Sequence, residues 1–418
     1  MFRIIAAFAS GNIAAMALGT LGSLVQARYV GPEDMGIFRT FGIAVGYLTF
    51  LHLGVFDGLQ REIPLQLGRG ERAKAEKAAS ACLAWILVIS AVCATAFLVL
   101  ALRAARNGEW KQAVGWLAYM PLIVSTFYGG YLGTTFRTGQ QFVLLAKSAV
   151  IAAVAGSLVL PLMPLLGYFG ACLRTVVSSI TGLLVMHRMR PLKIRPRLDW
   201  HGFREVVRIG LPLSGAGYVA TSLWVSMEGT FILAWYGANM LGLYAMAALV
   251  RSVVVQLAQN VNQVVNVRVC EQYGRSGRVE DCVRVVLKPA ALSMLGSLPV
   301  VAIGWLALPW VVPLLTPKYV GAIHLMQLML LAMPMAFLSL PVTILWATGR
   351  RVDCFAGASV GLVVFVGFAT VLHKSGSGAN SLIIASMVGQ LASISVSFLL
   401  ILRLALSPWG HAIQQEAR

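Results

Sequence analysis

The chain has 418 residues, of which 58% are hydrophobic and only 11% are charged. A soluble domain carries about 25% charged residues, so this composition excludes a water-facing globular surface and leaves the membrane as the solvent. The mean hydropathy of +0.80 agrees with this. The 33 Lys and Arg residues outnumber 15 Asp and Glu residues, but they lie in short loops instead of clustering on one soluble face, which argues against a nucleic-acid partner.

The six cysteines and six histidines form no metal-binding or disulfide pattern. No C-x-x-C pair occurs, and most cysteines lie inside apolar runs, where they pack as small apolar residues. We therefore expect no disulfide framework, no metal site and no cofactor. The cysteines are Cys82, Cys93, Cys172, Cys270, Cys282 and Cys354.

Apolar stretches of bilayer length, about 17–25 residues, follow one another along the chain with short breaks. The first is longer than the apolar region of a signal peptide, so we expect it to be retained. The pattern predicts an all-α integral membrane protein with about twelve transmembrane helices. The predicted spans are 4–27, 37–60, 79–101, 113–136, 143–166, 168–187, 209–235, 243–266, 289–315, 322–347, 355–372 and 380–404.

The distribution of positive charge predicts the orientation of these spans. Lys and Arg are concentrated in the loops after even-numbered spans, and short cytoplasmic loops carry such an excess. Both termini are therefore expected on the cytoplasmic side. The loops after odd-numbered spans hold only Arg28, Arg103, Arg106, Lys111, Lys318 and Lys374.

A basic stretch in the middle of the chain indicates a linker between two halves. Asp199 is expected to cap a following helix, with Leu198 and Phe203 as a hydrophobic staple, and the positive charge predicts contact with anionic lipid headgroups. The expected organisation is a six-helix lobe at 1–187, a cytoplasmic linker at 188–208, a second six-helix lobe at 209–404 and a tail at 405–418.

An internal repeat relates the two halves. A shift of 206 residues places Tyr29–Phe38 over Trp235–Tyr244, with Gly31 on Gly237 and Gly36 on Gly242. The same shift places Leu67–Arg72 over Tyr273–Arg278, and a further slip of four residues places Arg137–Gln141 over Ala347–Arg351. Six spans per half give both halves the same orientation. Such parallel repeats are related by an axis along the membrane normal, with the substrate site between them.

The hairpins at Arg28–Phe41 and Tyr236–Ala247, and the basic loop before Ile209–Pro212, carry a resemblance to a known family. The sequence resembles the polysaccharide (O-antigen type) flippases of the multidrug/oligosaccharidyl-lipid/polysaccharide exporter superfamily. The resemblance implies a V-shaped, MATE-like pair of six-helix lobes in the bacterial inner membrane. It also implies translocation of undecaprenyl-pyrophosphate-linked oligosaccharide to the periplasmic leaflet by alternating access, for O-antigen, capsule or exopolysaccharide assembly. The implied partners are this lipid-linked substrate, membrane lipids and a polysaccharide polymerase with its chain-length machinery.

Charged residues within the predicted spans are candidate site residues, because each costs about 2.5–3.5 kcal/mol at the bilayer centre. Arg251 in the eighth span and Glu228 in the seventh lie at nearly the same depth. In one interpretation they form an ion pair that neutralises both charges. In the other, Arg251 faces the cavity and binds pyrophosphate with its planar guanidinium. Arg28, Arg39 and Arg174 either extend to lipid headgroups or form a cationic vestibule that attracts the substrate.

Asp57 and His52 in the second span, together with Glu228, are the candidates for coupling transport to H⁺ or Na⁺. A desolvated carboxylate can exchange a proton, and a nearby histidine is a natural partner. The alternative role of Asp57 is to cap a helix end at Gly58.

Two other functions are alternatives to the flippase. A multidrug extruder of the same superfamily exports mostly organic cations and would need an acidic cavity. A membrane polysaccharide polymerase or ligase would need a large outward loop, but the longest one, Leu102–Gln112, has about eleven residues. No nucleophile–base constellation or nucleotide motif is present. We therefore expect a transporter and not an enzyme.

Overall fold

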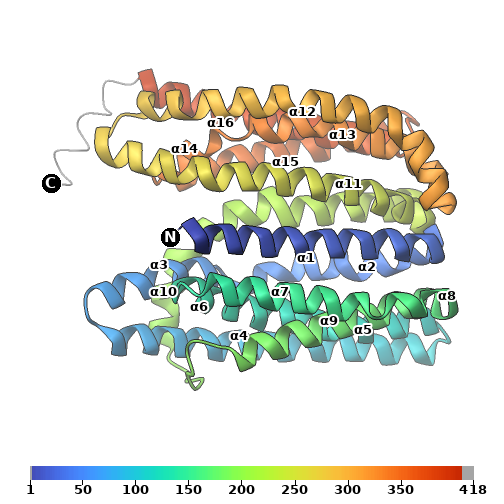
Figure 1. Ribbon diagram of the computed structural model, residues 1–418, viewed down its shortest axis with the longest axis horizontal. Coiled ribbons are helices and arrows are strands. Elements are labelled where there is room, and N and C mark those ends of the chain that lie inside the picture. Colours follow the sequence, from blue (N-terminus) through green and yellow to red (C-terminus); the bar gives the residue numbers. More distant parts are fainter. Residues whose placement is uncertain (1, 407–418) are drawn as a thin grey trace.

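The first half of the chain forms one bundle of helices in the computed structural model, which describes residues 2–406 (Figure 1). We call this bundle the first lobe. Its helices are α1 (Phe2–Tyr29), α2 (Pro32–Leu48), α3 (Val55–Gly68), α4 (Arg72–Arg106), α5 (Trp110–Val124), α6 (Gly130–Thr138), α7 (Phe142–Ser157), α8 (Met163–Leu166) and α9 (Tyr168–Arg188), with the short turns η1 (Thr49–His52), η2 (Ser125–Gly129) and η3 (Leu160–Leu162).

The second half forms a second bundle, the second lobe, most of which lies in the upper part of Figure 1, while its first helix begins beside α3 and α4 of the first lobe. Its long helix α11 is broken at Gly237, where φ is +80°, so it folds back as two antiparallel arms. The helices are α10 (Trp200–Tyr218), α11 (Trp224–Ser276), α12 (Val279–Leu315), α13 (Ile323–Leu338), α14 (Val342–Ala347), α15 (Arg351–Lys374) and α16 (Asn380–Leu406), with the turns η4 (Val219–Leu223) and η5 (Pro317–Ala322).

The described helices confirm the predicted all-α membrane fold, and they can be grouped into twelve passes. By length and apolarity alone, 8 helices qualify as spans, and the bent pair α2–α3 makes 9. The span Ser214–Gln256 folds back at Gly237 and so contributes a pass in each direction. Helix α1 and the broken helix α5–α6 supply the remaining passes. The start of α1 and the end of α16 lie at the same end of the molecule (Figure 1).

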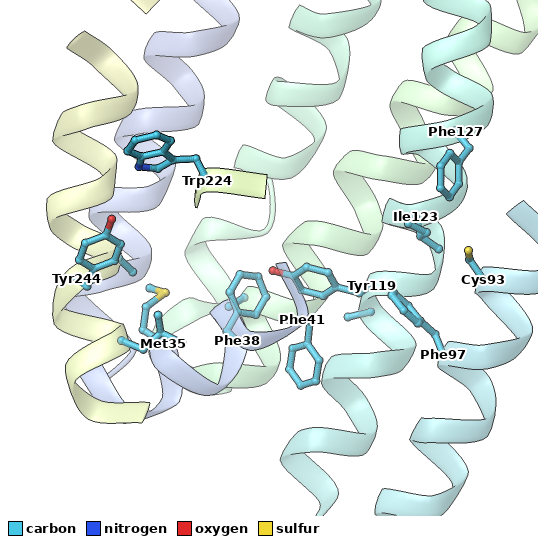
Figure 2. Packing of buried hydrophobic residues seen from close by; sticks show 14 of the residues in the cluster. Met35, Phe38, Phe41, Cys93, Phe97, Tyr119, Ile123, Phe127, Trp224 and Tyr244 are labelled. Carbon is cyan, nitrogen blue, oxygen red and sulfur yellow. The ribbon is translucent and has the colours of Figure 1, made fainter. Parts of the chain in front are cut away.

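An aromatic core fixes α2 to the rest of the first lobe (Figure 2). Phe41 packs against Tyr119 and Trp116 of α5, with ring centroids 5.5 and 4.8 Å apart. Phe38 meets the same Tyr119 edge-on at 5.3 Å. Burial of such rings is worth several kcal/mol, so the polar face of α2 is held in a defined position.

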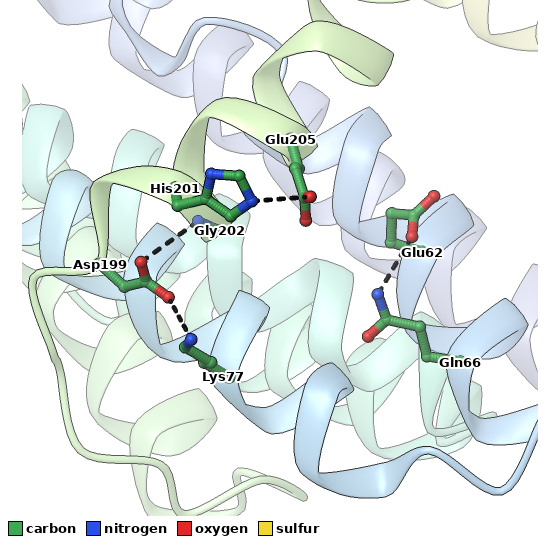
Figure 3. Close-up of polar contacts among 7 residues, drawn as sticks. All are labelled: Glu62, Gln66, Lys77, Asp199, His201, Gly202 and Glu205. Atoms are coloured by element: carbon green, nitrogen blue, oxygen red, sulfur yellow. Dashed lines mark hydrogen bonds and ion pairs between the residues drawn. The ribbon is translucent and has the colours of Figure 1, made fainter.

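Asp199 caps α10, as predicted, and also anchors the linker before it (Figure 3). Its carboxylate accepts a hydrogen bond from the Gly202 backbone N–H at 3.3 Å and pairs with Lys77 of α4 at 3.2 Å. The hydrogen bond from the Gly202 N–H, and to a smaller extent the one from the Lys77 ammonium, lower the pKa of the Asp199 carboxyl. The predicted hydrophobic staple is wrong, because Leu198 is 90% exposed. Phe203 packs instead against Trp85, 5.1 Å away, on the first lobe.

The two lobes meet at their hairpins through two reciprocal backbone contacts. A Cβ atom built on Gly36 would lie 1.7 Å from the carbonyl oxygen of Ala238, and one built on Gly242 would lie 1.6 Å from that of Pro32. Gly36 and Gly242 are 206 residues apart, and so are Pro32 and Ala238, which is the offset of the repeat. The repeat therefore builds a two-fold-related contact that only glycine permits.

Replacing Gly36 with alanine should push the hairpins apart. Because the obstructing atom belongs to the backbone, we expect a loss of about 1–3 kcal/mol, as for other overpacked sites. The measurement is the midpoint of thermal unfolding in detergent. Gly367→Ala is the control, since no atom lies within 4 Å of its added Cβ. A Gly36→Ala protein as stable as this control would contradict the contact.

Candidate functional site

Arg39 of α2 lies where two cavities between the lobes meet. One cavity, of about 370 Å³, is lined by the α2 face that carries Arg39, Gly42 and Gly46, together with residues of η4 and both arms of α11. These α2 residues share a face because they are spaced three, four and seven apart. The other cavity, of about 320 Å³, lies among α1, α2, α5, α9 and α11 and is also lined by Arg39.

Arg174 of α9 lines the second of these cavities and is held in place. Its guanidinium donates to Gln26 Oε1 at 3.0 Å and to the Gly19 carbonyl at 3.1 Å. It fills the space beside Gly22, where a Cβ would lie 2.4 Å from it. Arg39, in contrast, is exposed to the cavities and has no hydrogen-bond or ion-pair partner among the described side chains.

The charge lining these two cavities is positive. Arg39 and Arg174 lie in their walls, and the described lining residues include no Asp or Glu. An unpaired guanidinium favours an anion, and it binds phosphate or carboxylate oxygens two at a time. Arg28 is exposed at the end of α1 and lines neither cavity.

A third cavity, of about 520 Å³, brings His52 and Asp57 together as the sequence predicted. The chain bends at Leu53 and Gly54, both with positive φ, so His52 ends η1 and Asp57 lies in the first turn of α3. The role of Asp57 as a cap at Gly58 is therefore wrong. His52 Nδ1 accepts the Gly54 N–H at 3.0 Å.

Two sets of residues that line these cavities were not predicted from the sequence. Arg61 lines the third cavity one turn after Asp57, and its spacing of four residues from a carboxylate was the available signal. Thr221 and Ser222 line both the third cavity and the 370 Å³ cavity. They belong to the π-helical turn η4, a distortion common at functional sites. The three cavities therefore follow one another along the interface between the lobes.

Arg251 and Glu228 form the ion pair that the sequence left as one alternative. Their side chains are 11% and 2% exposed, with Arg251 Nη1 2.5 Å from Glu228 Oε2. The Tyr244 hydroxyl donates to the same oxygen at 2.6 Å, and the guanidinium lies 6.0 Å from the Tyr244 ring centroid. Neither charged residue lines any of the three cavities. The pair ties the two arms of α11 together.

Removing one partner of this pair should destabilise the protein strongly. Glu228→Ala leaves a buried, uncompensated guanidinium, and such changes cost about 3–5 kcal/mol. The double variant Glu228→Leu/Arg251→Met removes both charges and should recover most of the loss. Thermal unfolding in detergent measures both. A double variant no more stable than Glu228→Ala would show that charge compensation is not what Glu228 provides.

Comparison with known proteins identifies the family. The family model described as polysaccharide biosynthesis protein matches residues 25–324. The chain belongs to this family. No match is found among curated protein sequences.

Solved structures show that this family member has a MATE-like transporter fold. An inward-facing multidrug resistance MATE family transporter of the MOP superfamily matches with a TM-score of 0.77 and 17% identity over 96% of both chains. An outward-facing structure of such a transporter matches with a TM-score of 0.69 and 18% identity over 96% of both. A MOP superfamily transporter from Pyrococcus furiosus matches with a TM-score of 0.68 and 18% identity over 97% of both chains. Its binding pocket is described as having reverse polarity.

Proposed function

We propose that this member of the polysaccharide biosynthesis protein family is a flippase for undecaprenyl-pyrophosphate-linked oligosaccharide repeat units. The observation that carries the proposal is the unpartnered guanidinium of Arg39 in cavities whose described walls hold no carboxylate. A pyrophosphate-linked lipid is an anion whose oxygens match that guanidinium. Arg174, already oriented by Gln26, supplies a second cation to the same space.

The polarity of the cavities favours this substrate over an organic cation. A multidrug extruder for cations would place carboxylates where Arg39 and Arg174 lie. The transporter from Pyrococcus furiosus, with its pocket of reverse polarity, shows that this fold accommodates a change in pocket charge. One carboxylate, Asp57, lines the third cavity, where we assign it to ion coupling with His52.

The structure represents an inward-facing state in this proposal. The lobes touch at the hairpins through Gly36 and Gly242. Apart from α10, which packs on α3 through Gly210 and Gly54, their ribbons separate toward the end where α1 begins (Figure 1). The higher TM-score against the inward-facing transporter, 0.77 against 0.69, supports the assignment. The positively charged loops at that end favour the cytoplasmic side for it. Transport then consists of rocking the lobes 1–187 and 209–404 about linker 188–208, without covalent chemistry.

Replacing Arg39 with alanine should reduce export of repeat units roughly tenfold to a hundredfold, because a hydrogen bond to a charged group is worth about 1.5–3 kcal/mol. The measurement uses cells lacking the gene and complemented with each variant. Lipid-linked repeat units on the inner leaflet are quantified along with surface polysaccharide.

Arg28→Ala is the matched control for this experiment. It removes the same charge from the same hairpin but outside the cavities, so it should complement the deletion like the wild type. Normal export by Arg39→Ala would remove Arg39 from the substrate path. Deletion of the gene without accumulation of repeat units would refute the proposed substrate itself.

Replacing Asp57 with asparagine should uncouple export from the ion gradient. The amide cannot exchange a proton or neutralise Na⁺, so export should fall and stop responding to a protonophore or to external Na⁺. Gln60→Ala alters a neutral residue of the same cavity and should keep the wild-type response. If Asp57→Asn retains that response, the coupling group lies elsewhere.

A further inference from the structure

The hairpin that joins α11 to α12 carries a cleft apart from the three cavities described above. The cleft has a volume of about 820 Å³. Four cations and one carboxylate line it, and all four cations are exposed with no hydrogen-bond or ion-pair partner for their side chains in the described part of the chain. These residues are Arg268, Glu271 and Arg275 on α11 and Arg284 and Lys288 on α12.

The corresponding place in the first lobe is closed by the chain itself. At the 206-residue offset, Arg284 and Lys288 correspond to Ala78 and Cys82, which are both buried. There the linker lies on the start of α4, and Ser80 Oγ donates to the Arg195 carbonyl at 2.5 Å. The second lobe leaves the equivalent helix start open and places exposed cations on it, so an anionic ligand from outside the described fold can reach them.

The cleft lies at the level of the lipid headgroups. Helix α12 has 37 residues, about 55 Å at 1.5 Å per residue, which exceeds the hydrocarbon core of about 30 Å. On the face of α12 that carries Arg284 and Lys288, the exposed leucines begin at Leu292 and Leu295, at 61% and 59% exposure. Lys288 precedes Leu292 by about one turn and Arg284 by about two, so their charges lie just beyond the apolar surface.

We propose that this cleft binds the phosphate of an anionic membrane phospholipid. The guanidinium groups of Arg268 and Arg284 match phosphate oxygens in pairs, and Lys288 adds a third positive charge. The acyl chains then lie along the leucines of α12. Such a lipid anchors the α11–α12 hairpin of the second lobe to the membrane surface. The site lies outside the transport route, so it does not depend on the proposed substrate.

Native mass spectrometry of the full-length protein released from nanodiscs tests the site. Nanodiscs made of phosphatidylglycerol and phosphatidylcholine supply the anionic and zwitterionic lipids. We expect the wild type to retain phosphatidylglycerol selectively. Each cation near an anionic headgroup is worth about a fivefold change in affinity, so Arg284→Ala/Lys288→Ala should bind it roughly 25-fold more weakly.

Arg103→Ala/Arg106→Ala is the matched control, because it also removes two exposed cations. These lie in the last turn of α4, whereas Arg284 and Lys288 lie near the start of α12, the counterpart of α4 in the repeat. It should retain phosphatidylglycerol like the wild type. All three proteins must elute as a single folded species. Equal retention by Arg284→Ala/Lys288→Ala and the wild type, or an equal loss in the control, would overturn the proposal. So would a wild type that binds inorganic pyrophosphate but not phosphatidylglycerol, since the cleft would then take a free anion.

Discussion

The close contact between the two hairpins is the constraint on which the rest of the structure depends. The Pro32 carbonyl lies over Gly242, and the Ala238 carbonyl over Gly36. The Tyr319 hydroxyl adds a hydrogen bond of 3.1 Å to the Val30 carbonyl at the same end. Because the lobes are joined there, α2 and α11 run side by side, and the cavities lined by their facing surfaces follow from that arrangement.

The charges near these helices occur in three different settings. Glu228 neutralises Arg251 in a buried pair, and Arg174 is held by a side-chain amide and a backbone carbonyl. Arg39 is left without a partner among the described side chains, although an intramembrane charge costs about 2.5–3.5 kcal/mol. The fold compensates the charge at the other sites and leaves Arg39 exposed to the cavities, and this difference is the basis of the anion site proposed above.

The two halves share a scaffold but not its chemistry. At the 206-residue offset, Arg39 corresponds to Ala245, and both line the same two cavities. The first lobe therefore places a cation, Arg39, in the cavity walls, and the second lobe places a small side chain, Ala245, at the equivalent position. In the same way Gly22 corresponds to Glu228. One leaves room for the guanidinium of Arg174, and the other pairs with that of Arg251.

The sequence by itself determined the membrane class, the twelve passes and the two-fold repeat, because apolar length and an offset of 206 are properties of the chain. It also placed Arg251 and Glu228 at one depth, and the structure showed that they pair. Only the tertiary structure separated Arg39 from Arg28, since which of two nearby arginines enters a cavity depends on helix rotation and on the facing lobe. The failed staple at Leu198 has the same cause, because Phe203 packs against Trp85, a partner distant in sequence.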